Sequence, residues 1–111
     1  MVTSSSDLCS LFGALSDATR LAVVARLADG PASVSALAEP HATSRQSIMK
    51  HIAVLEDAGL VTSAKAGRVR TVTLKVEALD EIEGFVRAHR HRVERRLDRL
   101  GEFLTEGHDD E

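Results

Sequence analysis

The chain contains one cysteine, no tryptophan, no tyrosine and only three phenylalanines among its 111 residues. With so few aromatic rings, it lacks the stacking platforms on which single-stranded nucleic acids are bound. The lone Cys9 allows neither a disulfide within the chain nor a cysteine-based metal cluster. The apolar runs are short and the Ser-rich start, residues 1–7, lacks the basic and apolar regions of a secretory signal. We therefore expect a cytoplasmic protein with no membrane-spanning segment.

The sequence also lacks the features that identify most enzymes. It has no glycine-rich phosphate loop, no promising Ser–His–Asp order and no pair of carboxylates in an evident cleft. A chain of 111 residues has room for about one domain, so separate substrate and cofactor domains are excluded. Apolar residues make up 43% and charged residues 28%, as in an ordinary globular protein. We expect a single folded domain that is not an enzyme and needs no cofactor.

Positive charge is concentrated in the middle of the chain. The whole chain has a net charge of −3, but residues 41–75 alone carry +4, between segments of −2 (1–40) and −5 (76–111). Local patches, rather than the total charge, steer a protein towards phosphate groups. The middle segment is therefore a candidate for binding nucleic acid, although a solvated face with spare lysines and arginines would have the same composition.

Apolar spacing and capping residues predict four helices in the first half of the chain. Their expected ranges are about 8–15, 18–28, 33–39 and 44–58. The residues expected to face inward from the second helix are Leu21, Val24 and Leu27. Ser16 and Asp17 offer capping oxygens for the second helix and Ser33 for the third, while either Thr43 or Ser44 can cap the fourth.

The hydrophobic period then changes to that of strands. Residues 61–65 and 69–75 are β-prone runs on either side of Ala66-Gly67, which predicts a hairpin. A long helix is expected from about 77 to 104, followed by a frayed acidic tail, 105–111. The fold class is thus mainly α with a small β-hairpin wing. The element order is that of a single winged helix-turn-helix domain, 1–111, with its core at 8–76 and the helix-turn-helix at 33–58.

Three stretches resemble the ArsR/SmtB family of winged-helix repressors. Leu15-Ser16-Asp17-Ala18-Thr19-Arg20 is similar to the family's L-x-D-x-T-R start. Residues 47–61, SIMKHIAVLEDAGLV, resemble its S-K-H-L-x-x-L-x-x-A-G-L-V signature, except that Met49 stands where serine is usual. Ala66-Gly67-Arg68 before a strand resembles the wing. The resemblance covers residues 8–104 and implies a homodimeric transcriptional repressor of the metal-ligand-poor branch, which often regulates its own operon.

The start of the helix at 44–58 would then enter the major groove of operator DNA. Arg45 can bridge guanine O6 and N7, Gln46 can pair with adenine, and Lys50 is better suited to phosphate. His51 is also placed to pack against the turn. The wing would lie on the backbone or in the minor groove. The full set of candidate DNA-binding residues is Ser44, Arg45, Gln46, Ser47, Lys50, His51, Lys65, Arg68 and Arg70.

We predict that the long helix mediates dimerisation, because apolar residues recur along it in steps of three and four. With the first helix, it gives the candidate interface Leu8, Leu11, Phe12, Leu79, Ile82, Val86, His89, Val93 and Leu100. Acidic residues (Asp80, Glu81, Glu83) lie near its start and basic ones (Arg95, Arg96, Arg99) near its end. An antiparallel partner helix crossing near His89 would bring opposite charges together. Ordinary pairs within one helix, such as Glu83 with Arg87, are the alternative.

Metal binding is only weakly indicated. Residues 33–38 contain no thiolate or imidazole, and no Asp-x-His precedes the His91-x-x-Glu94 spacing. His89 and His91 lie about 200° apart around one helix, so sharing an ion would require a partner chain. We expect no metal, and keep as alternatives a zinc- or nickel-responsive repressor with a bridging site at His89, His91 and Glu94, or a dimeric interaction module that does not bind DNA.

Overall fold

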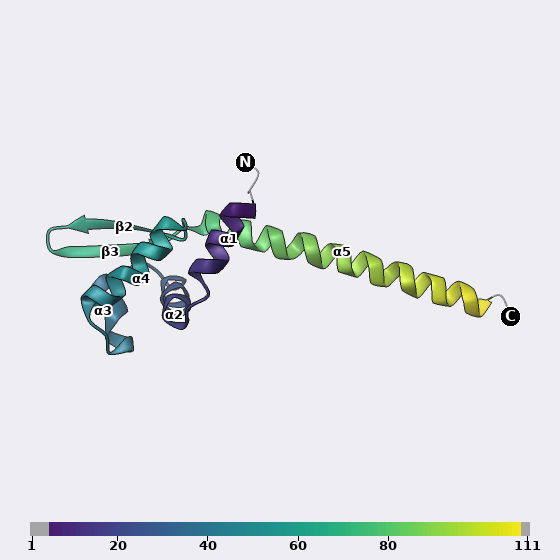
Figure 1. The fold of residues 1–111 in the computed structure, drawn as a ribbon, viewed down its shortest axis with the longest axis horizontal. Helices are drawn as coiled ribbons and strands as arrows, with labels where there is room; N and C mark the ends of the chain where they lie inside the picture. The colour runs from purple at the N-terminus through teal and green to yellow at the C-terminus, as the bar shows by residue number, and fades with distance from the viewer. Residues whose placement is uncertain (1–4, 110–111) are drawn as a thin grey trace. The chain divides into compact units, whose positions relative to one another are not determined.

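The computed structural model describes residues 5–109, and these form two compact units that meet between Glu81 and Ile82. The first unit holds most of the secondary structure, and the second is the remainder of the last helix (Figure 1). The elements are α1 (Ser5–Ala14), α2 (Ala18–Leu27), β1 (Ala32–Ser33), α3 (Val34–Ala38), the 3₁₀ turn η1 (Glu39–His41), α4 (Arg45–Asp57), β2 (Val61–Ala66), β3 (Val69–Leu74) and α5 (Val76–Asp109). The mainly α winged helix-turn-helix order is therefore confirmed.

Polar side chains start three of these helices. Asp17, Ser33 and Ser44 each accept a hydrogen bond at 3.1 Å from the backbone amide three residues further along. Each satisfies one of the amides that the first turn of a helix leaves without a partner. The cap of α4 is therefore Ser44 and not Thr43.

The turn of the helix-turn-helix joins α3 to α4. It consists of η1, which contains Pro40, and then Ala42, whose φ of +48° is in the left-handed region. A non-glycine residue adopts this conformation at some energetic cost, and it reverses the chain sharply. The reversal directs the chain into the Ser44 cap, so α4 starts at a fixed place relative to α3.

The sheet has three antiparallel strands in the order β1-β3-β2, one more than the hairpin that the sequence predicts. The hairpin itself is confirmed, with a two-residue loop whose first residue, Gly67, has a φ of +62°. Glycine adopts this conformation without steric cost, which suits a tight hairpin loop. The additional strand β1 pairs Ala32 with Val72 and Ser33 with Thr71. It ties the start of α3 to the wing.

The core of the first unit is apolar and draws on every helix and on the sheet. Its most deeply buried side chains are Leu11, Val23, Val34, Leu37, Ile48, Ile52, Leu55, Leu60, Val61 and Val72. The expected inner face of α2 was wrong in part, because Val23 and Leu27 are buried whereas Leu21 is 54% exposed. Because α2 packs against α4 and β3, the buried face of α2 is displaced around the helix from the expected one, towards Val23.

Helix α5 is longer than expected. It continues to Asp109, so the expected frayed tail is helical as far as the structure describes it, and residues 110–111 lie outside the described residues. Residues 105–109 contain no proline and follow an established helix, where each further residue adds a hydrogen bond at little cost. Thr105 also donates from Oγ1 to the carbonyl of Gly101 at 2.9 Å.

Within the described residues, no single helix is both long and apolar enough to cross a membrane. The segments Asp7–Ala14 and Ala18–Leu27 would be long and apolar enough only when taken together. The chain bends by 97° between them.

Candidate nucleic-acid interface

Helix α4 buries one face and exposes the other. Ile48, Ile52 and Leu55 are almost completely buried, which fixes the rotation of the helix about its axis. The side chains expected to read DNA lie at the start and on the opposite face. Ser44, Arg45, Gln46 and Lys50 are exposed, and Ser47 is half-buried. The start of α4 therefore presents one guanidinium, one carboxamide and one ammonium group to solvent.

The wing carries the other candidate cations. Lys65 and Arg68 are exposed near its tip, whereas Arg70 is half-buried. The Nη1 atom of Arg70 donates to Ser63 Oγ at 2.9 Å, and Ser63 Oγ donates to Glu56 Oε1 at 3.2 Å. This chain of contacts runs from β3 through β2 to α4. Arg70 is thus held against the protein by one of its nitrogens, while Arg68 projects from the loop.

A hollow of about 180 Å³ brings the two cationic elements together. It is lined by Ser33, Val34, Ser35, Arg45, Arg68, Val69 and Arg70. Three of these seven side chains are arginines and none is acidic, so their positive potentials add in one place. The pairing of β1 with β3 shapes this hollow, because it sets the start of α3 beside the wing. A guanidinium presents a planar fork of donors that matches the oxygens of a phosphate group.

His51 differs from the other candidates, because it faces the protein interior. Its Nδ1 atom lies 3.5 Å from Arg20 Nη1 and 3.7 Å from Asp17 Oδ2, and its side chain is only 25% exposed. The hydrogen bond from the Arg20 amide, followed by the charges of His51 and Arg20, holds the pKa of Asp17 below its usual value. His51 thus has partners within the protein, and its contact with DNA stays a prediction. Both neighbours belong to the L-x-D-x-T-R stretch, Leu15 to Arg20, but nothing in that stretch indicated a contact with His51.

The candidate dimer residues fall into two groups. Leu11 is only 2% exposed and packs in the core of its own protomer, so it is removed from the proposed interface. It lies on the inner side of α1, which apolar spacing alone does not distinguish from the outer side. The remaining residues of α1, Leu8 and Phe12, are half-buried and 40% exposed, respectively.

Along α5, Ile82 is half-buried and the other candidates are exposed: Leu79, Val86, His89, Val93 and Leu100. Five more large apolar side chains of α5 are exposed as well: Val76, Phe85, Leu97, Phe103 and Leu104. Every side chain described from Glu83 to Thr105 is exposed. This part of α5 therefore presents an apolar stripe that its own chain leaves uncovered.

Two of the residues considered as metal ligands, His89 and Glu94, contact other residues of the same helix. His89 Nδ1 lies 2.8 Å from the carbonyl oxygen of Phe85, and the two rings stack with centroids 4.2 Å apart. Glu94 pairs with Arg90 at 3.3 Å within the same helix. Across the part of the chain that the structure describes, no three His, Cys, Asp or Glu side chains form a group that could hold a metal ion.

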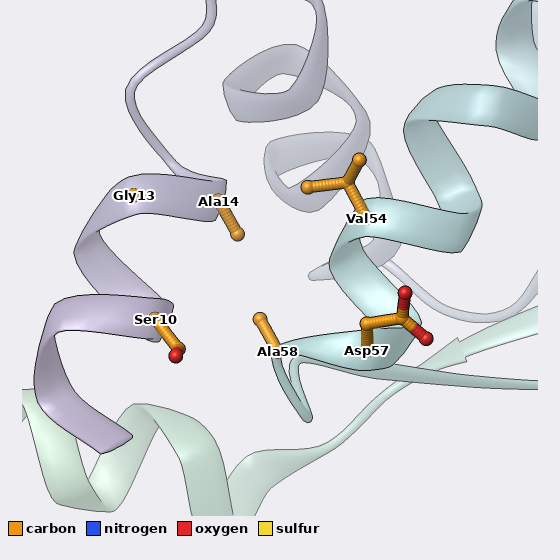
Figure 2. A pocket seen from close by; sticks show the side chains of 6 residues that line it. All are labelled: Ser10, Gly13, Ala14, Val54, Asp57 and Ala58. Atoms are coloured by element: carbon orange, nitrogen blue, oxygen red, sulfur yellow. The ribbon is translucent and has the colours of Figure 1, made fainter. Parts of the chain in front are cut away.

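A second hollow, of about 340 Å³, lies between α1 and the end of α4 (Figure 2). It is lined by Ser10, Gly13, Ala14, Val54, Asp57 and Ala58. The methyl groups of Ala14 and Ala58 point into the gap, whereas the carboxylate of Asp57 points away from it. These side chains present small apolar groups and not the converging polar groups by which a charged cofactor is held.

Comparisons with known proteins agree with this geometry. A helix-turn-helix domain family matches residues 15–64, which include α2 to α4 and the first part of the wing. The HTH-type transcriptional regulator Rv2034 of Mycobacterium tuberculosis is 44% identical over 61 residues, and this match covers 55% of the present chain. It spans only 57% of the length of that relative.

Solved structures extend the similarity along the chain. The crystal structure of an ArsR-family transcriptional regulator is 40% identical, with a TM-score of 0.78, and the match covers 85% of this chain and 97% of that one. The homodimeric winged helix-turn-helix DNA-binding domain Mb0332 of Mycobacterium bovis shares the fold, with a TM-score of 0.63 and 22% identity over 78% of this chain and 82% of its own. The chain belongs to the ArsR family of transcriptional regulators.

Proposed function

We propose that the protein is a homodimeric repressor that binds a palindromic operator, including one at its own operon. The observation that carries this proposal is the hollow shared by Arg45, Arg68 and Arg70. The first residue of α4 and two residues of the wing line this one hollow, which supports contact of both elements with the same segment of DNA. Neither element alone is a strong indication, because hairpin tips and helix starts are commonly charged.

The start of α4 enters the major groove. Arg45 and Gln46 are exposed in the first turn of the helix and supply the two side-chain types that read guanine and adenine most directly. Ser44 and Ser47 contribute less, because the Ser44 hydroxyl already accepts the Ser47 amide. Lys50 lies one turn further along and binds phosphate. The wing residues Lys65, Arg68 and Arg70 contact the backbone or the minor groove.

Dimerisation presents two copies of this interface. The exposed stripe of α5 supports it, because a row of large apolar side chains along a water-exposed helix is stable only when a partner covers it. The same fold occurs as a homodimer in the domain from Mycobacterium bovis. A two-fold axis would set the two copies of α4 about one turn of DNA apart, which corresponds to a palindromic site.

The charges of α5 favour an antiparallel partner helix. Glu83 pairs with Arg87 and Glu94 with Arg90 inside the helix, as the alternative interpretation expects. Among the described residues, the remaining arginines of α5 have no ion pair within the chain: Arg92, Arg95, Arg96 and Arg99. Asp80 and Glu81, near the opposite end of the helix, are available to these arginines on a second copy. We therefore place the two-fold axis near His89.

Quantitative DNA binding tests the proposal. The full-length protein is titrated into a labelled duplex from immediately upstream of its gene, and into a scrambled duplex, at two salt concentrations. The repressor should bind the upstream duplex at least tenfold more tightly, with an affinity that falls steeply with salt because many phosphates are contacted. Equally weak binding to both duplexes would contradict the proposal and favour the interaction module.

A further inference from the structure

Arg20 connects the end of α1 to the middle of α4. From the first turn of α2, its Nε donates to the carbonyl of Ala14 at 2.6 Å and its Nη2 to that of Gly13 at 3.3 Å. These carbonyls belong to the last turn of α1, and that of Gly13 also accepts from the Ser16 amide at 3.2 Å and from Ser16 Oγ at 2.6 Å. The third nitrogen, Nη1, lies 3.5 Å from His51 Nδ1. One side chain thus caps α1 and contacts the helix that we place in the DNA groove.

His51 Nδ1 has two neighbours that require opposite protonation states of this nitrogen. A guanidinium stays protonated and can only donate, so a hydrogen bond from Arg20 requires an unprotonated Nδ1. The carboxylate of Asp17, 3.7 Å away, can only accept, so an ion pair with it requires a proton on the imidazole. The two contacts therefore exclude each other at this nitrogen: neutral His51 accepts from Arg20 when its proton is on Nε2, whereas the imidazolium carries a proton on Nδ1 as well and pairs with Asp17.

His51 is the imidazole of this cluster, and its neighbours are a carboxylate and a guanidinium. Asp17 is the N-cap of α2, and the Arg20 amide that it accepts lowers its pKa, so it stays ionised. Of the other elements packed on α4, α3 has no titratable side chain. The titratable groups of α1 are Asp7 and Cys9, both near its start, and β2 contributes the exposed Lys65 near the hairpin tip. Imidazole is the side chain that ordinarily titrates between pH 5 and 8.

We propose that Arg20 and His51 are positioning residues for DNA recognition, and that the proton on His51 selects the anchor of α4. Neutral His51 accepts from Arg20 and ties α4 to the end of α1. Protonated His51 takes its proton from solvent, turns to Asp17 and is repelled by Arg20, so that the tie to α1 is lost. The consequence for DNA rests on the proposed function, whereas the exchange of partners does not.

The exchange should lower the affinity for DNA in acid. The base-reading side chains of α4 are held by the packing of the helix and by its polar contact at His51, and the exchange replaces the contact with Arg20, which also holds the end of α1, by one with Asp17 at the start of α2. The loss of one such hydrogen bond corresponds to about a three- to tenfold change in an equilibrium constant. If His51 instead touched DNA directly, a proton would add a positive charge at the interface, strengthen binding and steepen the salt dependence.

The exchange of partners is tested without DNA, by NMR titration of the full-length protein from pH 8 to pH 5. In the wild type, the amides of Leu15 and Ser16, which follow the capped end of α1, should shift with the midpoint of the His51 imidazole. In H51Q this coupled shift should disappear, because glutamine can accept from Arg20 and donate to Asp17 at every pH. In R20K, whose ammonium lacks the guanidinium fork, the His51 imidazole should still titrate but the amides at residues 15–16 should not follow it.

Two results would overturn the proposal in this experiment. One is that the amides at the end of α1 do not follow His51 in the wild type. The other is that they follow equally in H51Q, which keeps the cap and the core unchanged and so remains informative even where R20K proves too unstable to measure.

The effect on recognition is tested with the upstream duplex at pH 8 and pH 6. Wild-type affinity should fall about three- to tenfold more than that of H51Q over this range, with the same salt slope in both proteins. Equal pH profiles, or tighter and more salt-dependent wild-type binding at pH 6, would overturn the positioning role. If neither protein prefers the upstream duplex at any pH, the proposed function fails, and the NMR titration alone decides the exchange of partners.

Discussion

Arg45, the first residue of α4, and Arg68, in the loop of the wing, line the same hollow in the folded protein. One residue opens a helix and the other lies in the loop of a hairpin, and α4 packs directly against strand β2 of that hairpin. This relationship gathers part of the positive charge of the middle of the chain around one hollow. It also allows the contributions of the two arginines to be separated by experiment.

The first prediction concerns these two side chains. R45A should weaken binding to the preferred duplex by about 1–3 kcal/mol and relax the preference over the scrambled duplex, because it removes a base contact. R68A should weaken binding to both duplexes alike and reduce the salt slope by about one, because it removes a phosphate contact. Fluorescence anisotropy titrations at several salt concentrations measure both effects.

R26A is the matched control, since it removes one positive charge from the exposed surface of α2. Its binding should stay close to that of the wild type. An R26A defect as large as that of R45A would mean that total charge, and not the shared hollow, governs binding.

The second prediction concerns the dimer. Reversing two charges in R95E/R99E should weaken self-association by about 1–4 kcal/mol, because each chain would lose two pairs with Asp80 and Glu81 of the partner. Adding D80R/E81R to the same chain should restore much of the loss, since the opposite charges then meet again. Sedimentation equilibrium at low ionic strength measures both variants. Unchanged association of R95E/R99E would exclude the antiparallel arrangement.

The third prediction concerns acid stability. The pKa of Asp17 is lowered in the folded protein, mainly by the hydrogen bond from the Arg20 amide. A carboxylate with a lowered folded pKa stabilises the fold above its unfolded pKa of about 3.9, and this contribution is lost as the pH falls through the folded value. D17N should therefore lose less stability than the wild type between pH 5 and pH 2.5, because asparagine keeps the cap but does not titrate.

Urea unfolding across this pH range gives the comparison between D17N and the wild type. D17A provides the control, because it should be less stable than D17N at pH 7 through loss of the cap. Parallel stability curves for D17N and the wild type would show that Asp17 contributes nothing to the acid transition.

The fourth prediction contrasts two glycines. Gly67 has a φ of +62°, so G67A should destabilise the wing by about 1–2 kcal/mol although nothing lies within 4 Å of the added Cβ. Gly84 lies inside α5 with similar open space and no positive φ, so G84A should stabilise the helix by about 0.5–1 kcal/mol. Thermal unfolding of both variants measures whether each substitution lowers or raises the stability of the protein. A destabilising G84A would indicate that another chain approaches this side of α5.

The helices and the hairpin could be predicted because each has a local signal. Serine and aspartate caps, apolar residues in helical spacing, and Gly67 between two β-prone runs all act within a few residues of where they lie. The exposed positions of Arg45 and Gln46 also follow from the local pattern, since Ile48, Ile52 and Leu55 fix the buried face of α4.

Contacts between distant residues could not be predicted in the same way. Strand β1 has two residues and exists only because Val72 and Thr71 pair with it. The burial of Leu11 and the inward direction of His51 likewise depend on how α1, α2 and α4 meet, which no spacing within one helix encodes. The end of α5 was misjudged for another reason, because polar composition was taken as a sign of fraying although the segment 105–109 contains no proline and continues an established helix.

The most direct test of the proposed function is a hydroxyl-radical footprint of the full-length protein on the duplex upstream of its gene. A dimer that inserts two copies of α4 into the major groove predicts two protected half-sites of related sequence, about 10 base pairs apart and symmetric about their centre. Weaker protection outside each half-site would mark the wings. A single or unsymmetric protected segment, or uniform protection along the duplex, would contradict binding as a symmetric dimer.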